Sequence, residues 1–263
     1  MKVFLKIGVS GAREAAARGD VVVVVDALRA SVTITCALVV GAVKVIPVLT
    51  VVEARAYLDR KGYLVAGERG GVQIEGFHFG NSPTELWRQA TEVRGKTLVL
   101  TTSSGTRCVE AARGGAAQCP EPCPEPRRRA CPELAEGAVE GAVLAGALPN
   151  ATALAQAAFD LAGERGRDIA LIAAGVNGQA AVEDLFAAQV IAQRLVAMGA
   201  VLAEGEWVDH AAESEAAEVL KNSLSGQKLR GLGYGEDVAF CAQMDVFDVV
   251  PILRDGGFVA LPQ

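Results

Sequence analysis

Apolar runs rich in β-branched residues alternate along the chain with longer segments whose apolar residues recur at helical spacing. The run Val21–Val25 consists of valine alone, which is typical of a strand covered on both faces of a parallel sheet. The pattern predicts strands near 21–25, 44–48, 63–66, 96–100, 139–145, 169–173 and 246–252. It predicts helices at 31–40, 51–61, 150–162, 180–198 and 211–222, and Ser31 can cap the first of them. It also predicts one shorter helix that starts at Ser82-Pro83 and another that ends near Arg113.

Strands that alternate with helices predict a three-layer α/β/α fold with a mostly parallel or mixed sheet. A chain of 263 residues with 51% hydrophobic content can bury a sizeable core, as one domain over 1–263 or as two lobes. The segment 114–137 interrupts the alternation, because its prolines, cysteines and arginines preclude a regular helix. We expect this segment to be an exposed insertion in a single α/β domain.

Such sheets bind ligands in the crevice at the carboxyl ends of their strands. Four loops follow predicted strands in this way, at 26–31, 67–81, 101–107 and 174–184. If the sheet brings these ends together, one crevice collects hard oxygen ligands and cations from distant parts of the chain. The candidate oxygen ligands are Asp26, Glu68, Glu75 and Asp184, and the candidate cations are Arg29, Arg69 and Arg107.

Asp26 follows five valines directly, so its carboxylate needs a partner such as Mg²⁺ or the N–H groups of a following turn. Arg29 and the start of the next helix form a potential anion site beside it, and the alternative for Arg29 is an ordinary surface residue. Glu183 and Asp184 suit a metal-facing role, and equally the positive end of a helix dipole. These alternatives stay open at the level of sequence.

The segment 67–85 combines five glycines with three acidic residues, an arginine, a histidine and an Asn-Ser-Pro turn. Such a segment cannot build a core, whereas glycine lets the main chain approach a ligand closely. We interpret it as an active-site loop and include Asn81 and Ser82 among the substrate-binding candidates. His78 lies between two phenylalanines, a setting that favours a packed, hydrogen-bonded histidine over a catalytic one.

A run of hydroxyl residues follows the strand predicted near 96–100. Hydroxyls and free backbone N–H groups at a strand-to-helix turn suit a phosphate or a sulfonate, although a helix cap would look similar. No Walker A or dinucleotide-binding pattern accompanies the run. The candidate anion-binding residues here are Thr101, Thr102, Ser103, Ser104, Gly105, Thr106 and Arg107.

Charge and composition narrow the range of partners. A net charge of −6 argues against a nucleic-acid surface, which needs a dense basic patch. No apolar run approaches the length of a membrane span, and the N-terminal residues lack a secretory pattern. We therefore expect a cytoplasmic protein that binds neither nucleic acid nor membrane, with its six cysteines as reduced thiols.

Several stretches resemble one known family, the magnesium-dependent 2-phosphosulfolactate phosphatases of coenzyme M biosynthesis. They occur in the family's order and cover nearly the whole chain outside the insertion. The stretch at 67–83 is the most specific. The matching stretches are V-V-V-D-A-L-R-A-S at 23–31, G-A-V-K-V-I-P-V at 41–48, G-E-R-G-G-V-Q-I-E-G-F-H-F-G-N-S-P at 67–83, T-T-S-S-G-T-R at 101–107, V-E-D at 182–184 and F-D-V-V-P at 247–251.

The resemblance implies an α/β phosphatase that uses Mg²⁺ to hydrolyse the phosphate ester of 2-phosphosulfolactate. We expect Mg²⁺ to be held by Asp26 with one or more of Glu68, Glu75 and Asp184, and to activate a water molecule. Asp26, Glu68 and Arg29 are then the catalytic candidates, with Arg29 and the hydroxyl run on the phosphate and Arg69 or Arg107 on the sulfonate or carboxylate. The family usually carries Asp where this chain has His78, and Mg²⁺ prefers oxygen to imidazole.

Other functions remain compatible with the sequence. The chain could act on another small phosphorylated hydroxy acid, since no sulfonate code is readable, or it could bind the anion without turnover. An attack by Asp26 itself is disfavoured, because an aspartyl-phosphate route usually places a second Asp two residues later, where this chain has Leu28. The expected partner is a small anionic phosphorylated substrate, and assembly into a homo-oligomer stays open.

Overall fold

The computed structural model describes residues 1–114, 142–205, 207 and 212–262. The insertion expected at 114–137 therefore lies outside the described residues, apart from Gly114 at its start. His210 and the cysteines at 119, 123 and 131 also lie outside them.

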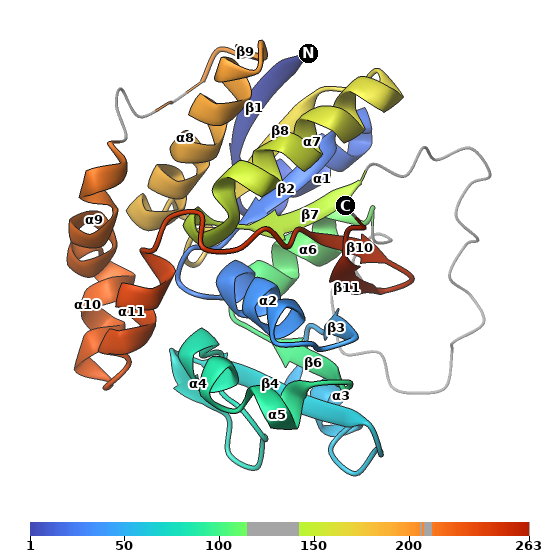
Figure 1. The fold of residues 1–263 in the computed structure, drawn as a ribbon, viewed down its shortest axis with the longest axis vertical. Coiled ribbons are helices and arrows are strands. Elements are labelled where there is room, and N and C mark those ends of the chain that lie inside the picture. Colours follow the sequence, from blue (N-terminus) through green and yellow to red (C-terminus); the bar gives the residue numbers. More distant parts are fainter. Residues whose placement is uncertain (115–141, 206, 208–211, 263) are drawn as a thin grey trace.

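The described strands form one 11-stranded sheet with the order β5-β4-β6-β3-β11-β10-β7-β2-β8-β1-β9 (Figure 1). The strands are β1 (Lys2–Ile7), β2 (Val21–Val25), β3 (Lys44–Pro47), β4 (Tyr63–Arg69), β5 (Val72–Gln73), β6 (Thr97–Thr101), β7 (Val143–Gly146), β8 (Ile169–Ala173), β9 (Val201–Leu202), β10 (Pro251–Arg254) and β11 (Gly257–Ala260). The helices are α1 (Gly8–Arg18), α2 (Ala30–Val39), α3 (Val51–Arg55), α4 (Pro83–Arg88), α5 (Ala90–Val93), α6 (Gly105–Ala112), α7 (Ala151–Arg165), α8 (Val182–Ala197), α9 (Ala216–Asn222), α10 (Leu224–Gly231) and α11 (Gly235–Cys241), with short 3₁₀ helices η1 (Leu148–Asn150) and η2 (Glu213–Glu215).

The sheet consists of two parallel blocks joined by an antiparallel hairpin. Strands β4, β6 and β3 form one block, and β7, β2, β8, β1 and β9 form the other. Three antiparallel pairings separate them, β3 with β11, β11 with β10 and β10 with β7, so the blocks run in opposite directions. Their carboxyl ends nevertheless meet, because the side chain of Arg29, after β2, donates to the carbonyl of Gly71, after β4, at 2.8 Å.

Helices cover both faces of the larger block, which gives the three-layer α/β/α architecture expected from the sequence (Figure 1). Alternate valines of β2 face opposite ways: Val21, Val23 and Val25 join a core with α7 and α8, while Val22 and Val24 join a core with α1, α2 and α6. All five are buried. Each contributes about 1.5 to 3 kcal/mol by burial, which explains why the run holds the centre of this block.

Some predicted elements differ from the structure. Ser31 does not cap α2, which begins at Ala30; its hydroxyl instead accepts from the N–H of Asp26 and donates to the carbonyl of Val24. The strand predicted near 246–252 is replaced by the hairpin β10–β11, which turns at Asp255 and Gly256. Strand β1 and helices α1, α10 and α11 had no counterpart in the predicted pattern.

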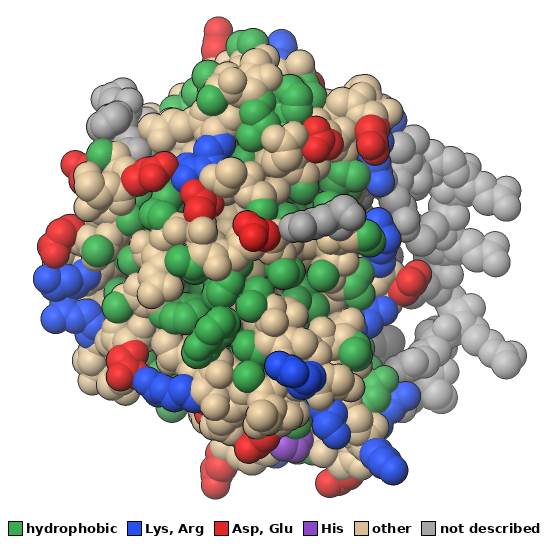
Figure 2. All heavy atoms as spheres, viewed as in Figure 1, with side chains coloured by type: hydrophobic (Ala, Val, Ile, Leu, Met, Phe, Trp, Pro, Cys, Tyr) green, Lys and Arg blue, Asp and Glu red, His purple; other side chains and the backbone are tan. Residues whose placement is uncertain are grey.

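The three C-terminal helices α9 to α11 pack together and against α4 and α8 (Figure 1). Aromatic rings support this packing, with the ring centroids of Phe240 and Phe247 5.9 to 6.2 Å from that of Trp87. On the face drawn in Figure 2, apolar side chains gather near the centre and charged side chains surround them. Within the described residues, no helix is both long and apolar enough to cross a membrane.

Candidate active site

A pocket of about 520 Å³ lies where the loops after β2, β4, β6 and β8 converge, and α10 forms part of its wall. Both parallel blocks contribute to it, because β4 and β6 belong to one and β2 and β8 to the other. Its volume is in the range of small-molecule sites. The predicted site residues that line it are Asp26, Arg29, Glu68, Asn81, Thr102, Ser103, Ser104 and Asp184.

Asp26 sits at the end of the valine strand, as the sequence indicates, and its side chain is buried. Its Oδ1 accepts from the N–H of Ala30 at 3.1 Å, whereas its Oδ2 receives no hydrogen bond from any described residue. Burial raises the pKa of Asp26 to about 6, and the negative charges of Glu68 and Glu183 act in the same direction. The carboxyl group therefore gains from a cation or a proton.

Asp184 and Glu183, in the first turn of α8, bring further buried carboxylates to the pocket. The oxygens of Asp184 accept from the N–H groups of Ala27 and Gly175, each at 2.8 Å, so this side chain ties together the loops after β2 and β8. Burial raises the pKa of Asp184 well above its usual value, and the charges of Asp26 and Glu183 add to that effect. Glu183 is 3% exposed, and its carboxylate accepts no hydrogen bond from the described residues.

Glu68 organises the backbone around the pocket. Its Oε1 accepts from the N–H of Ser103 and its Oε2 from the N–H of Gly71, both at 2.7 Å. The first bond crosses from β4 to the loop after β6, and the second closes the turn between β4 and β5. Both oxygens of Glu68 are thus already bound by main-chain donors.

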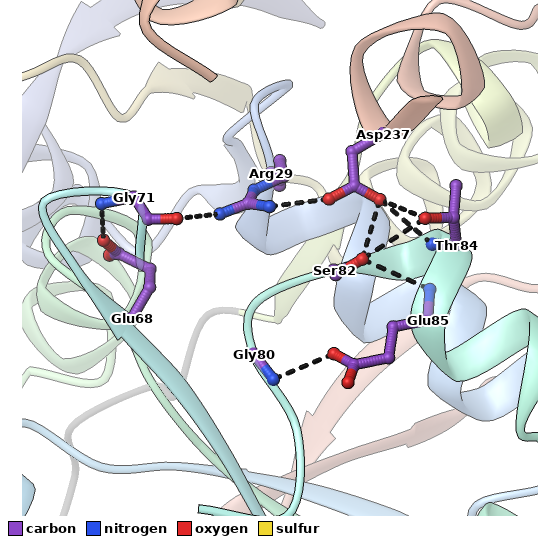
Figure 3. A network of polar contacts seen from close by, with 8 residues as sticks. All are labelled: Arg29, Glu68, Gly71, Gly80, Ser82, Thr84, Glu85 and Asp237. Carbon is purple, nitrogen blue, oxygen red and sulfur yellow. Dashed lines mark hydrogen bonds and ion pairs between the residues drawn. The ribbon is translucent and has the colours of Figure 1, made fainter. Parts of the chain in front are cut away.

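Arg29 is held by a polar network that reaches the last helix (Figure 3). Its Nη1 lies 2.6 Å from Oδ2 of Asp237 on α11, and its guanidinium lies 4.5 Å from the ring centroid of Tyr234. The other oxygen of Asp237 accepts from the hydroxyl of Ser82 and from the N–H and hydroxyl of Thr84. Nη2 of Arg29 donates to the carbonyl of Gly71, so Arg29 connects α11 to the turn after β4 and also forms part of the pocket wall.

The hydroxyl run after β6 divides into two groups. Thr102 and Thr106 bond each other, since the hydroxyl of Thr106 donates to the carbonyl of Thr102 at 3.1 Å and its N–H donates to the Thr102 hydroxyl at 3.3 Å. These two residues therefore stabilise the start of α6, which is the helix-cap role that the sequence left open beside anion binding. Ser103 and Ser104 are less buried and line the pocket.

Gly105 brings α6 close to Asp26 without lining the pocket. A Cβ atom at this position would lie 2.7 Å from Oδ2 of Asp26 and 2.8 Å from Cβ of Ala30. A side chain there would displace one of them. Gly105 therefore lets the two parallel blocks approach each other.

The remaining sequence candidates lie outside the pocket lining. Arg69 is exposed and donates to the hydroxyl of Thr101 and to the carbonyl of Glu68. Arg107 and Glu75 are also exposed. Ser82 caps α4 by accepting from the N–H of Glu85 at 3.2 Å, besides its bond to Asp237.

His78, where this chain departs from the family pattern, is exposed and lies outside the pocket lining. Its Nδ1 accepts a hydrogen bond at 3.0 Å from the N–H of Val65 in β4. The departure thus affects support for the backbone of β4 and not the pocket wall.

Sequence reasoning missed the two polar pocket residues on α10, Ser225 and Lys228, and the partner of Arg29 on α11, Asp237. No motif signals them, because their helices follow no predicted strand. Asn81 was a candidate, but its distinguishing property emerges only in three dimensions. It is 4% exposed, and its Oδ1 is buried without a hydrogen-bond partner in the described structure.

The pocket as a whole carries excess negative charge, with four carboxylates against the cations Arg29 and Lys228. Burial raises the pKa of Asp26 and of Asp184, and the negative charge of Glu183 adds to both shifts. An anionic ligand would enter such a pocket only with a compensating cation. The arrangement suits chemistry in which a metal ion sits between carboxylates and an anionic substrate.

The sequence of this chain matches the model of the 2-phosphosulpholactate phosphatase family over residues 9–119 and 132–256. It is 37% identical to the 2-phosphosulfolactate phosphatase of Methanothermobacter thermautotrophicus, over 89% of this chain and 87% of that protein. It is 33% identical to a probable 2-phosphosulfolactate phosphatase of Thermotoga maritima, over 90% of each chain. A similarly named protein of Clostridium novyi is 30% identical over 95% of this chain and 96% of its own. The chain therefore belongs to the 2-phosphosulfolactate phosphatase family, a family of phosphoric monoester hydrolases.

Proposed function

We propose that this chain hydrolyses the phosphate ester of 2-phosphosulfolactate to sulfolactate and inorganic phosphate, with Mg²⁺ bound in the pocket. The names of its relatives support the substrate. The observation that carries the proposal is the set of buried carboxylates, Asp26, Glu183 and Asp184, in a pocket that also presents the serine hydroxyls of Ser103 and Ser104. These groups suit a metal ion and a phosphate in adjacent positions.

The donor chemistry of the pocket fits Mg²⁺, which takes oxygen ligands. Oδ2 of Asp26 and the carboxylate of Glu183 accept no hydrogen bond from the described residues. Burial, and to a lesser extent neighbouring negative charges, raise the pKa values of Asp26 and Asp184. The described residues contain no ready group of three metal-binding side chains. This is compatible with Mg²⁺, which is usually held by one or two carboxylates together with water and substrate phosphate.

In this proposal Asp26 holds Mg²⁺ together with Glu183, because both oxygens of Asp184 already accept from backbone N–H groups. When bound, the ion would neutralise charge on the phosphoryl oxygens and lower the pKa of a water molecule. Glu75 is too exposed to join this set, and the oxygens of Glu68 already bind two N–H groups. Glu68 then acts by fixing the loop that carries Ser103.

The reaction forms a bond between a water oxygen and phosphorus and breaks the ester bond from phosphorus to the sulfolactate oxygen. The water gives up a proton and the leaving oxygen takes one up. Ser103 and Ser104 donate to the phosphate oxygens, and the unpartnered Oδ1 of Asn81 is available to accept from water or from a protonated group. Water is the preferred nucleophile because Leu28 occupies the place of a second Asp.

Phosphate release from a panel of phosphorylated hydroxy acids, with Mg²⁺ and with EDTA, tests the proposal. We expect release from 2-phosphosulfolactate that EDTA abolishes and added Mg²⁺ restores. Release from other acids alone would point to a different substrate, and tight binding without release would point to a silent anion-binding protein. Trapping of a phosphoaspartate at Asp26 would show that Asp26, and not water, is the nucleophile that attacks phosphorus.

A cytoplasmic location and a place in coenzyme M biosynthesis belong to the same proposal. The cysteines that the structure describes, Cys36, Cys108 and Cys241, are free thiols, as expected in a reducing compartment. Burial raises the pKa of Cys36 and of Cys108 to about 12, which makes both thiols unreactive.

A further inference from the structure

Lys228 on α10 lines the pocket, and the reaction proposed above does not use its positive charge. Its ammonium group lies over the turn between β4 and β5, since a Cβ atom at Gly70 would be 3.9 Å from its Nζ. It forms no hydrogen bond or ion pair with any residue in the described part of the chain. Its three N–H donors are therefore available to a ligand.

The other cations near the pocket are already engaged or lie elsewhere. Arg29 donates to Asp237 and Gly71, and Arg69 donates to Thr101, Glu68 and Leu49. Arg107 is exposed and outside the pocket lining. Among the described residues that line the pocket, Lys228 is the cation that has no protein partner.

We propose that Lys228 binds the sulfonate of the substrate and so selects phosphorylated acids that carry a second strong anion one carbon beyond the phosphate ester. This inference rests on the proposed function and adds the residue that determines specificity. The carboxylates Asp26, Glu183 and Asp184 repel an uncompensated anion, so a sulfonate that lies beyond the metal-bound phosphate needs a separate cation.

A lysine suits this task chemically. Its ammonium is a compact charge on a flexible stem and meets a tetrahedral anion from any direction, whereas a planar guanidinium is best matched to two oxygens at once. Ser225, one turn earlier on α10, lines the same wall and offers a hydroxyl beside it. Because Lys228 is exposed at the mouth, salt weakens its attraction for the anion, and we expect a moderate effect on selectivity.

The experiment compares two substrates that differ only in the sulfonate. For 2-phosphosulfolactate, Lys228→Met should lower kcat/KM by about 10- to 100-fold, the usual effect of one lost hydrogen bond to a charged group. For 2-phospholactate, which has hydrogen in place of the sulfonate, kcat/KM should change less than about threefold, because no partner is lost. Lys228→Arg should restore part of the difference.

Arg230→Met is the matched control, because Arg230 lies on the same helix, is exposed and does not line the pocket. It should leave both kcat/KM values unchanged, and thermal melting should confirm that both variants fold. Equal losses on the two substrates in Lys228→Met would overturn the inference.

A binding measurement separates this inference from the proposed function. Calorimetry with sulfolactate and with lactate, in the presence of Mg²⁺, needs no turnover. We expect the wild type to bind sulfolactate more tightly than lactate and Lys228→Met to lose that preference. If the wild type shows no turnover but prefers sulfolactate, and Lys228→Met loses that preference, the proposed function fails and the inference stands. If the wild type shows no preference, or the variant keeps it, the inference fails.

Discussion

Nη1 of Arg29 lies 2.6 Å from Oδ2 of Asp237, although 208 residues separate them in the sequence, and their side chains are only 2% and 1% exposed. Through Arg29 the pair reaches the carbonyl of Gly71, and the N–H of Gly71 in turn donates to Glu68 (Figure 3). The other oxygen of Glu68 accepts from the N–H of Ser103. The last helix of the chain is thus connected to the pocket loops of both parallel blocks by an unbroken series of hydrogen bonds.

Asp237→Ala should destabilise the protein by about 3 to 5 kcal/mol, because it leaves a buried guanidinium without its counter-ion. It should also lower phosphatase activity, since Arg29 no longer fixes the turn at Gly71. Urea unfolding and kcat/KM measured on the same preparation test both effects.

Glu236→Ala is the control for that loss. Glu236 is adjacent on the same helix and forms an ion pair with Arg88, but both side chains are largely exposed. Its removal should cost at most about 1 kcal/mol. Similar losses in the two variants would show that burial of the Arg29 pair does not determine its contribution.

Glu68→Gln should lower kcat/KM on the order of 100-fold and cost about 1 to 3 kcal/mol in unfolding free energy. The amide NH₂ would face one of the two backbone N–H groups from which the carboxylate now accepts hydrogen bonds, which leaves a partly buried donor unpaired. Glu75→Gln, at an exposed position of the same loop region, should change neither quantity. Loss of activity in the second variant would support the sequence-based expectation that Glu75 binds the metal.

The sequence carried enough information to bring much of this pocket together. Asp26, Glu68 and Asp184 could be grouped because each follows, or soon follows, a strand predicted from its apolar residues, and that rule depends only on local pattern. Exposure could not be predicted in the same way. Arg69 and Glu75 share the composition of an active-site loop, but Arg69 points to Thr101 and Glu75 to solvent, as the pairing of β4 with β5 determines.

The direction of the strands was also beyond local pattern. The grouping rule assumes one parallel sheet, whereas the hairpin β10–β11 reverses one block relative to the other. The carboxyl ends still converge, so the grouping of the loops was right although its premise was incomplete. Lys228 and Asp237 come from helices packed over that junction, and tertiary contacts place them there.

Gly105→Ala should abolish most activity and destabilise the protein, because the new Cβ would meet Oδ2 of Asp26 and Cβ of Ala30 at less than normal contact distance. Overpacking of this kind costs about 1 to 3 kcal/mol. Gly163→Ala, inside α7, meets only the end of the Met1 side chain at 3.8 Å. It should stabilise the helix by up to about 1 kcal/mol and leave activity intact. Normal turnover in Gly105→Ala would show that the two blocks can separate without functional loss.

Asp26→Asn should inactivate the enzyme and yet stabilise the metal-free protein at neutral pH. The pKa of Asp26 is raised from 3.8 to about 6 in the folded state, so the stability that this group contributes is complete below pH 4 and is lost as the pH rises through 6. Each pKa unit corresponds to roughly 1.4 kcal/mol. In EDTA the variant should therefore gain about 2 to 3 kcal/mol over the wild type between pH 4 and pH 7.

Asp245→Asn provides a control with the opposite sign. Burial alone would raise the pKa of Asp245, but hydrogen bonds from Thr152 and Arg194 lower it overall. Its contribution is present above the unfolded pKa and is lost as the pH falls, so this variant should be less stable than the wild type at pH 7 and approach it in acid. Urea unfolding at several pH values measures both differences.

If the Asp26→Asn curve runs parallel to the wild type from pH 4 to 7, like charge and burial at Asp26 do not govern its ionisation, and the electrostatic argument for a cation in the pocket fails.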